Sequence, residues 1–284
     1  MTNPLSLLQS RSRLWRQPTA TPSRERSAIA ALMVGFTLWC AGGATPTRVA
    51  AATAQTAPPE LNRILQDIDA AANRQDIQGV MQFYSPTFVN SDGLDYQSLR
   101  EGLTQLWQRY PNLSYRTEIE SWERDGNGFK VETVTEITGV ETQNERNLSL
   151  TATVRSQQHY SNQQIVRQNI LAERNQITTG ENPPTLQINL PEEVRPGERY
   201  HFDAIVVEPL RNDLILGYAL EEPVRTTQYL IPSELKLEPL SAGGLFKVGQ
   251  APSTEDNRWI SAIIVRKDGI TMVTHRLRIV APSP

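Results

Sequence analysis

The chain has 284 residues, 28 basic and 31 acidic side chains, and a single cysteine. Residues 1–54 hold six arginines and one glutamate, so residues 55–284 keep 22 basic against 30 acidic side chains, a net charge of −8. An acidic surface repels phosphate backbones, which argues against a nucleic acid partner. Because Cys40 is the only cysteine, an internal disulfide and a zinc site built from several cysteines are excluded.

Residues 1–54 have the order of an export signal. Basic residues come first, the apolar run 28–42 follows, and the small-residue stretch 49–54 comes last. A signal peptidase requires small side chains at the first and third positions before its cut, and Ala52 and Ala54 provide them. We therefore expect residues 1–54 to be an export signal and linker, and the rest to be periplasmic, lumenal or secreted. The basic residues of the signal are Arg11, Arg13, Arg16, Arg24 and Arg26.

The same segment has a second interpretation as an uncleaved membrane anchor. No charged residue lies between Ser27 and Thr47, so residues 28–44 approach the length of a spanning helix. Glycine and proline interrupt this run, which favours cleavage. Under either interpretation the remainder faces away from the cytoplasm, and a retained helix would be its only membrane contact.

The first expected elements after the linker are helices. Apolar residues recur at three- and four-residue intervals over 61–72, directly behind Pro58 and Pro59. This pattern predicts an amphipathic helix with proline at its start. A short second helix is expected over 76–83, with its apolar side chains directed to the same core.

An extended stretch over 87–90 precedes a third helix, which runs from a cap at Asp95 to Tyr110 and ends before Pro111. Everything that follows up to residue 177 has strand composition, rich in Thr, Val, Ile and Tyr. Turn clusters divide it into four expected strands, 113–122, 129–140, 146–160 and 163–177. Three helices and a four-stranded meander predict an α+β domain over residues 55–180.

This order of elements resembles the nuclear transport factor 2-like superfamily, which includes SnoaL-like and ketosteroid-isomerase-like proteins. The best local match is residues 80–93, Val-Met-Gln-Phe-Tyr-Ser-Pro-Thr-Phe-Val-Asn-Ser-Asp-Gly. The resemblance implies a cone, in which a curved antiparallel sheet wraps around three N-terminal helices and encloses a pocket. It also implies that a homodimer could form through the exposed sheet face.

Residues 181–284 change character, because the helical period disappears after Pro183 and Pro184. Alternating apolar residues and turn signals predict a separate all-β domain, which resembles an immunoglobulin-like β-sandwich without the cysteines of antibody domains. Trp259 is expected in its core. The expected strands are 186–190, 200–207, 213–220, 226–231, 235–240, 245–248, 259–267 and 270–280, and the last two form a hairpin around Asp268-Gly269.

Candidate pocket residues of the cone are titratable, aromatic and amide side chains. In a ketosteroid-isomerase-like enzyme, the resemblance places an aspartate base on the short strand before the third helix. Alignment by Val89 puts Ser91 at that position and Asp92 one residue later, which turns the carboxylate to the opposite face. Asp92 beside Gly93 also fits a simple turn role. The candidates are Tyr84, Asp92, Tyr96, Trp107, Glu118, Glu132, Glu136, Arg155, His159, Arg167 and Asn169.

No set of residues has the spacing of a metal site, a cofactor site or a catalytic triad. The three histidines lie far apart, and no Gly-x-Ser-x-Gly or phosphate-binding loop occurs. Glu132 and Glu136 could form an acid-base pair, but residues four apart on a strand also share a solvated face. We therefore expect no cofactor and no metal.

Three hypotheses remain. The first is an exported, non-catalytic protein that binds a partner protein or a small apolar ligand through the cone pocket or the sheet face. The second is an isomerase, dehydratase or cyclase with an acid-base pair inside the cone. The third is an assembly factor that the N-terminal helix tethers to a membrane.

Overall fold

The structure is a computed structural model, and it describes residues 56–143, 146–211, 213–225 and 236–282. The export signal and the strand expected over 226–231 lie outside the described residues. Within the described part of the chain, no helix is long and apolar enough to cross a membrane.

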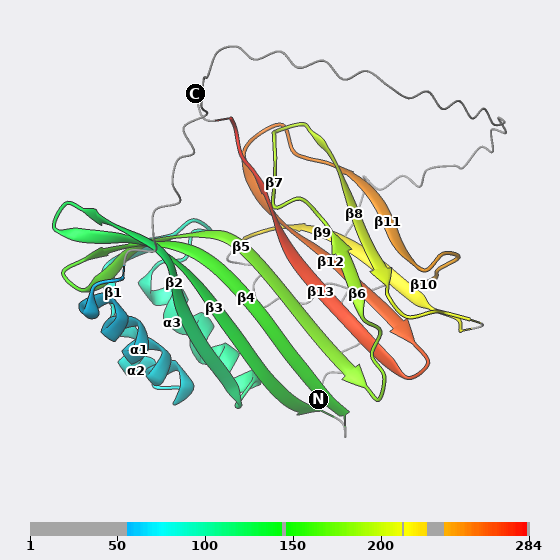
Figure 1. The fold of residues 1–284 in the computed structure, drawn as a ribbon, viewed down its shortest axis with the longest axis horizontal. Coiled ribbons are helices and arrows are strands. Elements are labelled where there is room, and N and C mark those ends of the chain that lie inside the picture. The colour runs from blue at the N-terminus through cyan, green and yellow to red at the C-terminus, as the bar shows by residue number, and fades with distance from the viewer. Residues whose placement is uncertain (1–55, 144–145, 212, 226–235, 283–284) are drawn as a thin grey trace, which may run out of the picture.

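Three helices open the described chain, where the sequence pattern predicts them (Figure 1). Helix α1 (Pro59–Asn73) begins with proline in its first turn, where a missing N–H costs no hydrogen bond. Helix α2 (Ile77–Met81) is short, and α3 (Tyr96–Arg109) starts with a capping box between Asp95 and Ser98. The apolar stripes of α1 and α3 are buried against the sheet.

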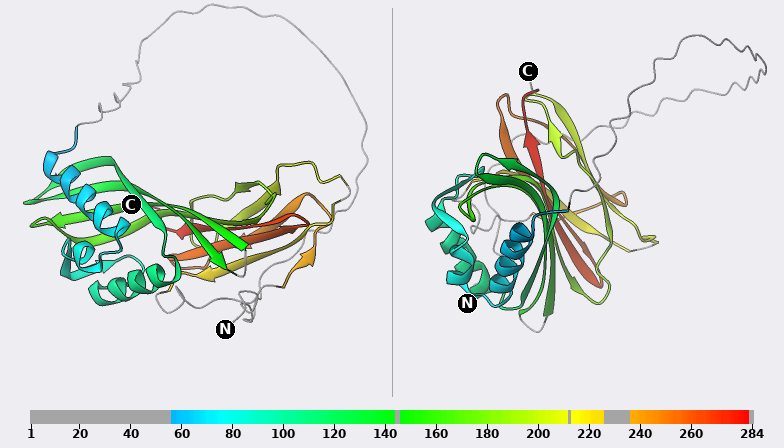
Figure 2. Two further views of the ribbon diagram at one scale, coloured as in Figure 1. Left: turned by 90° about the horizontal axis from the view of Figure 1, so that it is seen from below. Right: turned by 60° about the vertical axis from the view of Figure 1, so that its left-hand side comes forward.

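A long antiparallel meander follows the helices and curves around them (Figure 2). The short strand β1 (Tyr84–Asn90) precedes α3 and pairs in parallel with the last strand of the meander. The α+β part of the expected fold is therefore confirmed. The meander strands are β2 (Leu113–Asp125), β3 (Gly128–Gln143), β4 (Arg146–Ser161) and β5 (Gln164–Gly180).

The C-terminal part consists of strands in two layers. One layer is a three-stranded sheet in the order β11-β8-β6, and the other contains β10, β9, β12 and β13. A buried apolar cluster that includes Phe202, Ile260 and Leu277 fills the space between the layers. The strands are β6 (Leu186–Asn189), β7 (Glu193–Val194), β8 (Arg199–Val206), β9 (Leu216–Pro223), β10 (Glu238–Pro239), β11 (Gly244–Gln250), β12 (Asp256–Arg266) and β13 (Gly269–Ile279).

The C-terminal strands share a sheet with the meander, so the structure does not show the separate sandwich that the sequence predicts. Residues 269–275 of β13 pair with residues 174–180 of β5, so one ten-stranded sheet runs through both halves of the chain. The physical reason is that β5 would otherwise be an unpaired edge strand, and β13 supplies its missing hydrogen bonds. The helices cover one face of this sheet, and the three-stranded sheet lies against the other (Figure 2).

Strand β2 is the edge strand at the meander end of the sheet, and side chains of α1 protect it. The Asn73 side chain accepts a hydrogen bond from the Tyr115 N–H at 2.7 Å and donates one to the Tyr115 carbonyl at 3.0 Å. The Asp69 carboxylate accepts from the Thr117 N–H at 2.6 Å and from its hydroxyl at 2.7 Å. The helix thus supplies hydrogen bonds that a further strand would otherwise make.

Candidate functional site

The two halves of the chain meet where β5 and β13 separate. Their pairing ends at Arg174 and His275; beyond this point β5 pairs with β1, and the end of β13 pairs with β7. Arg276 is the first residue past the last paired position. We call this point of separation the fork. Polar side chains lie there on both faces of the sheet.

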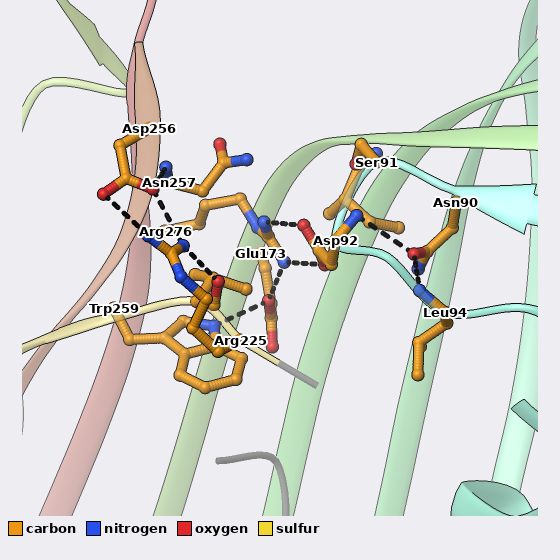
Figure 3. A network of polar contacts seen from close by, with 12 residues as sticks. Asn90, Ser91, Asp92, Leu94, Glu173, Arg225, Asp256, Asn257, Trp259 and Arg276 are labelled. Carbon is orange, nitrogen blue, oxygen red and sulfur yellow. Dashed lines mark hydrogen bonds and ion pairs between the residues drawn. The ribbon is translucent and has the colours of Figure 1, made fainter. Parts of the chain in front are cut away.

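On the helix-facing side, Arg276 binds two carboxylates from the N-terminal half (Figure 3). Its Nη1 and Nη2 donate to Asp92 Oδ1 and Oδ2, each at 2.8 Å, and Nη2 also donates to Glu173 Oε2 at 2.9 Å. The indole N–H of Trp259 donates to the same Glu173 oxygen at 3.1 Å. We call Asp92, Glu173, Trp259 and Arg276 the junction cluster.

Burial makes this cluster unusual among the ion pairs of the described chain. The Arg276 side chain is 1% exposed and Asp92 is 0% exposed. A buried charge is costly unless it is paired and hydrogen-bonded, and here both charges meet that condition. The cluster therefore fixes how the two halves are oriented, because loss of either partner leaves a buried charge uncompensated.

The turn that carries Asp92 is itself held rigidly. The Asn90 side-chain oxygen accepts hydrogen bonds from the N–H groups of Asp92, at 3.0 Å, and of Leu94, at 2.7 Å. Gly93 has φ of +88°, a conformation that glycine adopts without strain. Ser91 points elsewhere, since its hydroxyl accepts from the Ile170 N–H at 3.1 Å. Asp92 thus belongs to a hydrogen-bonded turn, and this turn directs its carboxylate toward Arg276.

The other side of the fork carries a second set of ion pairs. Glu192, just before β7, accepts hydrogen bonds from Arg174 at 2.6 Å and from Arg155 at 3.2 Å. His275 lies opposite Arg174 in the sheet register. Burial, and next the positive charge of Arg174, lower the pKa of His275 to about 4, although Glu192 opposes the shift. His275 is therefore neutral at physiological pH.

Side chains from the helices and strands fill the interior of the cone. Trp107 is buried and donates its indole N–H to the Tyr115 hydroxyl at 2.9 Å. Tyr84 packs edge-on against Phe88, and burial raises the pKa of Tyr84 to about 12. Tyr96 packs against the same apolar cluster as Tyr84. These three pocket candidates thus belong to the packed core between the helices and the sheet.

The interior also holds a buried chain of polar side chains on β3 and β4. Tyr160 donates to Gln158 at 2.6 Å, Gln158 contacts Ser156 at 3.4 Å, and Ser156 lies 3.2 Å from Thr133. Gln168 also donates to Ser156, at 3.2 Å. Because these side chains satisfy one another's hydrogen bonds, they form a stable polar stripe inside an otherwise apolar core.

The remaining candidates lie on the sheet face that points away from the helices, which we call the outer face. Val131 and Thr133 of β3 are fully buried toward the helices, so Glu132 between them points outward. Because Glu132 points outward, the register of the neighbouring strands places the other candidates on the outer face as well. They are Glu118, Glu136, Arg155, His159, Arg167 and Asn169.

The outer face has a hollow of about 270 Å³ at one end of the meander. It lies at a bulge in β5, where Val166 has no partner in the register between β4 and β5. His159 Nδ1 lies 3.2 Å from Asp125 Oδ2, and Arg167 lies opposite His159. The polar side chains that line the hollow are Asp125, Asn127, His159, Ser161 and Arg167.

These positions determine what chemistry the described residues can do. Asp92 is held by Arg276, while Glu132 and Glu136 point to the opposite face of the sheet. The carboxylates that an acid-base pair would use therefore do not converge on one cavity. Within the described ranges, no group of three or more His, Cys, Asp or Glu side chains could hold a metal ion.

Sequence reasoning missed Arg276, Glu173 and Asp125, and it assigned Trp259 to the core. The sequence carries no clear signal for Arg276, because Thr274 and Arg278 on the same face of the strand are also polar. A buried charge needs a partner of opposite charge, and that partner could not be read from the sequence.

Residues 181–280 match a family model described as a domain of unknown function, DUF8623. No curated protein matches this chain. Among solved structures, Bd1075 from Bdellovibrio bacteriovorus is similar with 17% identity and a TM-score of 0.30, over 39% of this chain and 40% of that one.

Other similar structures are smaller proteins. A cystatin-fold protein from Novosphingobium aromaticivorans has 15% identity and a TM-score of 0.28, over 38% of this chain and 94% of that one. An NTF2-like protein of unknown function from Cytophaga hutchinsonii has 8% identity and a TM-score of 0.23, over 41% and 92%. Similarity at these scores is too low to assign a family or a function.

Proposed function

We propose that this chain is an exported, non-catalytic binding protein that presents the outer face of its meander to a partner protein. In this proposal residues 55–180 are a nuclear transport factor 2-like domain, and residues 181–284 are an immunoglobulin-like sandwich fused to its sheet. Export rests on the order of residues 1–54.

The observation that carries the proposal is the distribution of polar side chains over the sheet. Helix-facing groups are paired inside the core or in the junction cluster, as Asp92 is with Arg276. The outer face instead presents ion pairs whose side chains are exposed to solvent, such as Arg116 with Glu136. Charged groups on a rigid sheet provide specificity and steering toward a partner.

The sheet continuity supports the same proposal. Because β13 and β5 pair and Arg276 bridges the halves, the outer face belongs to one rigid body. A rigid surface loses little conformational entropy on binding. The partner in this proposal is a different protein, and a second copy of the chain is the competing occupant.

Native mass spectrometry of the full chain, purified from its own exported compartment, tests this proposal. We expect a co-purifying protein subunit that is lost on charge reversal of Glu136→Lys and kept in Glu198→Lys, a control outside the meander. Detection of a homo-oligomer would mean that a second copy of the chain, and not a different protein, occupies the outer face. A retained small molecule would instead favour an isomerase, dehydratase or cyclase acting in the cone, and would overturn the proposal.

A further inference from the structure

The hollow at the end of the meander contains a positively charged side chain, Arg167, for which no partner is described. Across the outer face, Arg116 is paired with Glu118 and Glu136, and Lys130 is paired with Glu123. The side chain of Arg167 makes no hydrogen bond or ion pair within the described residues, and it lines the hollow. Its guanidinium is therefore available to an oxyanion that enters from solvent.

His159 is oriented beside this guanidinium. Its Nδ1 lies 3.2 Å from Asp125 Oδ2, and in the tautomer whose Nδ1–H donates to this carboxylate, Nε2 is an acceptor. The Asn127 amide also lines the hollow and can donate. The hollow thus combines donors for an anion with an acceptor for a neighbouring N–H or O–H group.

The charge of the hollow selects the kind of anion. One guanidinium matches a planar, singly charged carboxylate, which it can bind through two parallel hydrogen bonds. Asp125, whose side chain is 59% exposed, disfavours a doubly charged phosphate at the same place. The volume of about 270 Å³ admits the end of a chain rather than a large ligand.

We propose that this hollow binds a carboxylate with an adjacent N–H donor, as found at the C terminus of a peptide. The carboxylate contacts Arg167 and Asn127, and the last peptide N–H donates to His159 Nε2. This inference rests on the proposed function for the source of the peptide, and it names the group of the partner that is recognised.

Chemical-shift titration of the exported full chain tests the site directly. The probes are acetyl-tetraglycine with a free C terminus, its C-terminal amide, and acetyl-Gly-Asp-Gly-amide as a side-chain carboxylate. We expect the free C terminus to shift the His159 ring signals saturably, with a Kd of roughly 1 mM. Arg167→Gln should weaken this binding at least about tenfold. Arg116→Gln is the matched control, because it removes one charge from the same face away from the hollow.

Each outcome decides the inference. Equal binding of the amide, equal losses in the two variants, or no saturable shift would overturn it. Equal binding of the aspartate peptide would support the carboxylate site and overturn its assignment to a C terminus. Peptide binding without a co-purifying partner would support the site while the proposed function fails. A co-purifying partner that stays bound to the Arg167→Gln variant would support the proposed function while the inference about the hollow fails.

Discussion

Arg276 and Asp92 are 184 residues apart in the sequence and form a two-bond, fully buried ion pair between the two halves of the chain. Arg276 belongs to the last strand and Asp92 to the turn before the third helix. Glu173 joins the same guanidinium from the strand at which the two halves pair. The pair therefore lies at the boundary between the two halves.

Removing the guanidinium should strongly destabilise the protein. Arg276→Met leaves Asp92 and Glu173 without their shared cation, and we expect a loss of about 3–5 kcal/mol in the free energy of unfolding. Urea unfolding followed by fluorescence and circular dichroism measures it. Arg278→Met, which removes a more exposed partner of Glu193, is the control and should cost at most about 1 kcal/mol. Equal effects of the two variants would contradict the role assigned to the junction cluster.

A double-mutant cycle isolates the pair. Asp92→Asn alone should be destabilising because it removes the charge that compensates Arg276. If the two residues act through each other, the combined variant should lose less than the sum of the single losses, by about 1–3 kcal/mol. Additive losses would show that the residues act independently.

His275 should make stability depend on pH. Its folded pKa, about 4, lies below the ordinary value of 6.5, so the unfolded state binds the proton more readily. The contribution of His275 to the free energy of unfolding is complete above pH 6.5 and is lost as the pH falls toward 4. His275→Gln should flatten the stability profile in this window by about 2–3 kcal/mol. The exposed His201 provides the control, and an unchanged profile for His275→Gln would refute the prediction.

Asn73 should protect the free edge of the sheet. Asn73→Ala removes the hydrogen bonds to both backbone groups of Tyr115, and we expect a loss of about 1 kcal/mol in the free energy of unfolding. Light scattering should also show more self-association, because an uncovered strand edge can pair with another chain. Asn62→Ala, which removes one hydrogen bond at the start of α1, is the control for scattering.

Two glycines should respond to alanine in opposite directions. Gly180 has φ of +104°, and a Cβ there would lie 2.4 Å from the Asp268 carbonyl oxygen. Gly180→Ala should therefore cost about 2–3 kcal/mol at the pairing of β5 with β13. Gly102 lies in α3 with open space around it, so Gly102→Ala should stabilise by about 0.5–1 kcal/mol. Thermal unfolding of both variants measures the contrast, and a destabilised Gly102→Ala would contradict it.

Local patterns were sufficient to predict the helices and the meander. Proline at the start of α1, the Asp95 cap of α3 and the turns between the long strands are all short-range signals. The final hairpin around Asp268 was predicted on the same basis. The two-residue strand β7 was missed because it is too short to show alternation.

Long-range relationships could not be predicted in this way. The pairing of β13 with β5 joins strands about a hundred residues apart, and nothing in either sequence specifies the partner. The faces of β3 were ambiguous because Thr133 is polar yet fully buried. Glu132 and Glu136 were therefore pocket candidates by sequence, although the structure directs both outward.

The place of β13 also determines the order of events during synthesis. Among the described strands β13 comes last in the chain, yet it occupies the middle of the sheet, between β12 and β5. Until it emerges, the long edge of β5 has no partner over residues 174–180 and can pair with other chains. Folding of the first half therefore leaves one strand edge open until the second half is made. A stop codon before residue 269 would therefore remove a central strand of the sheet.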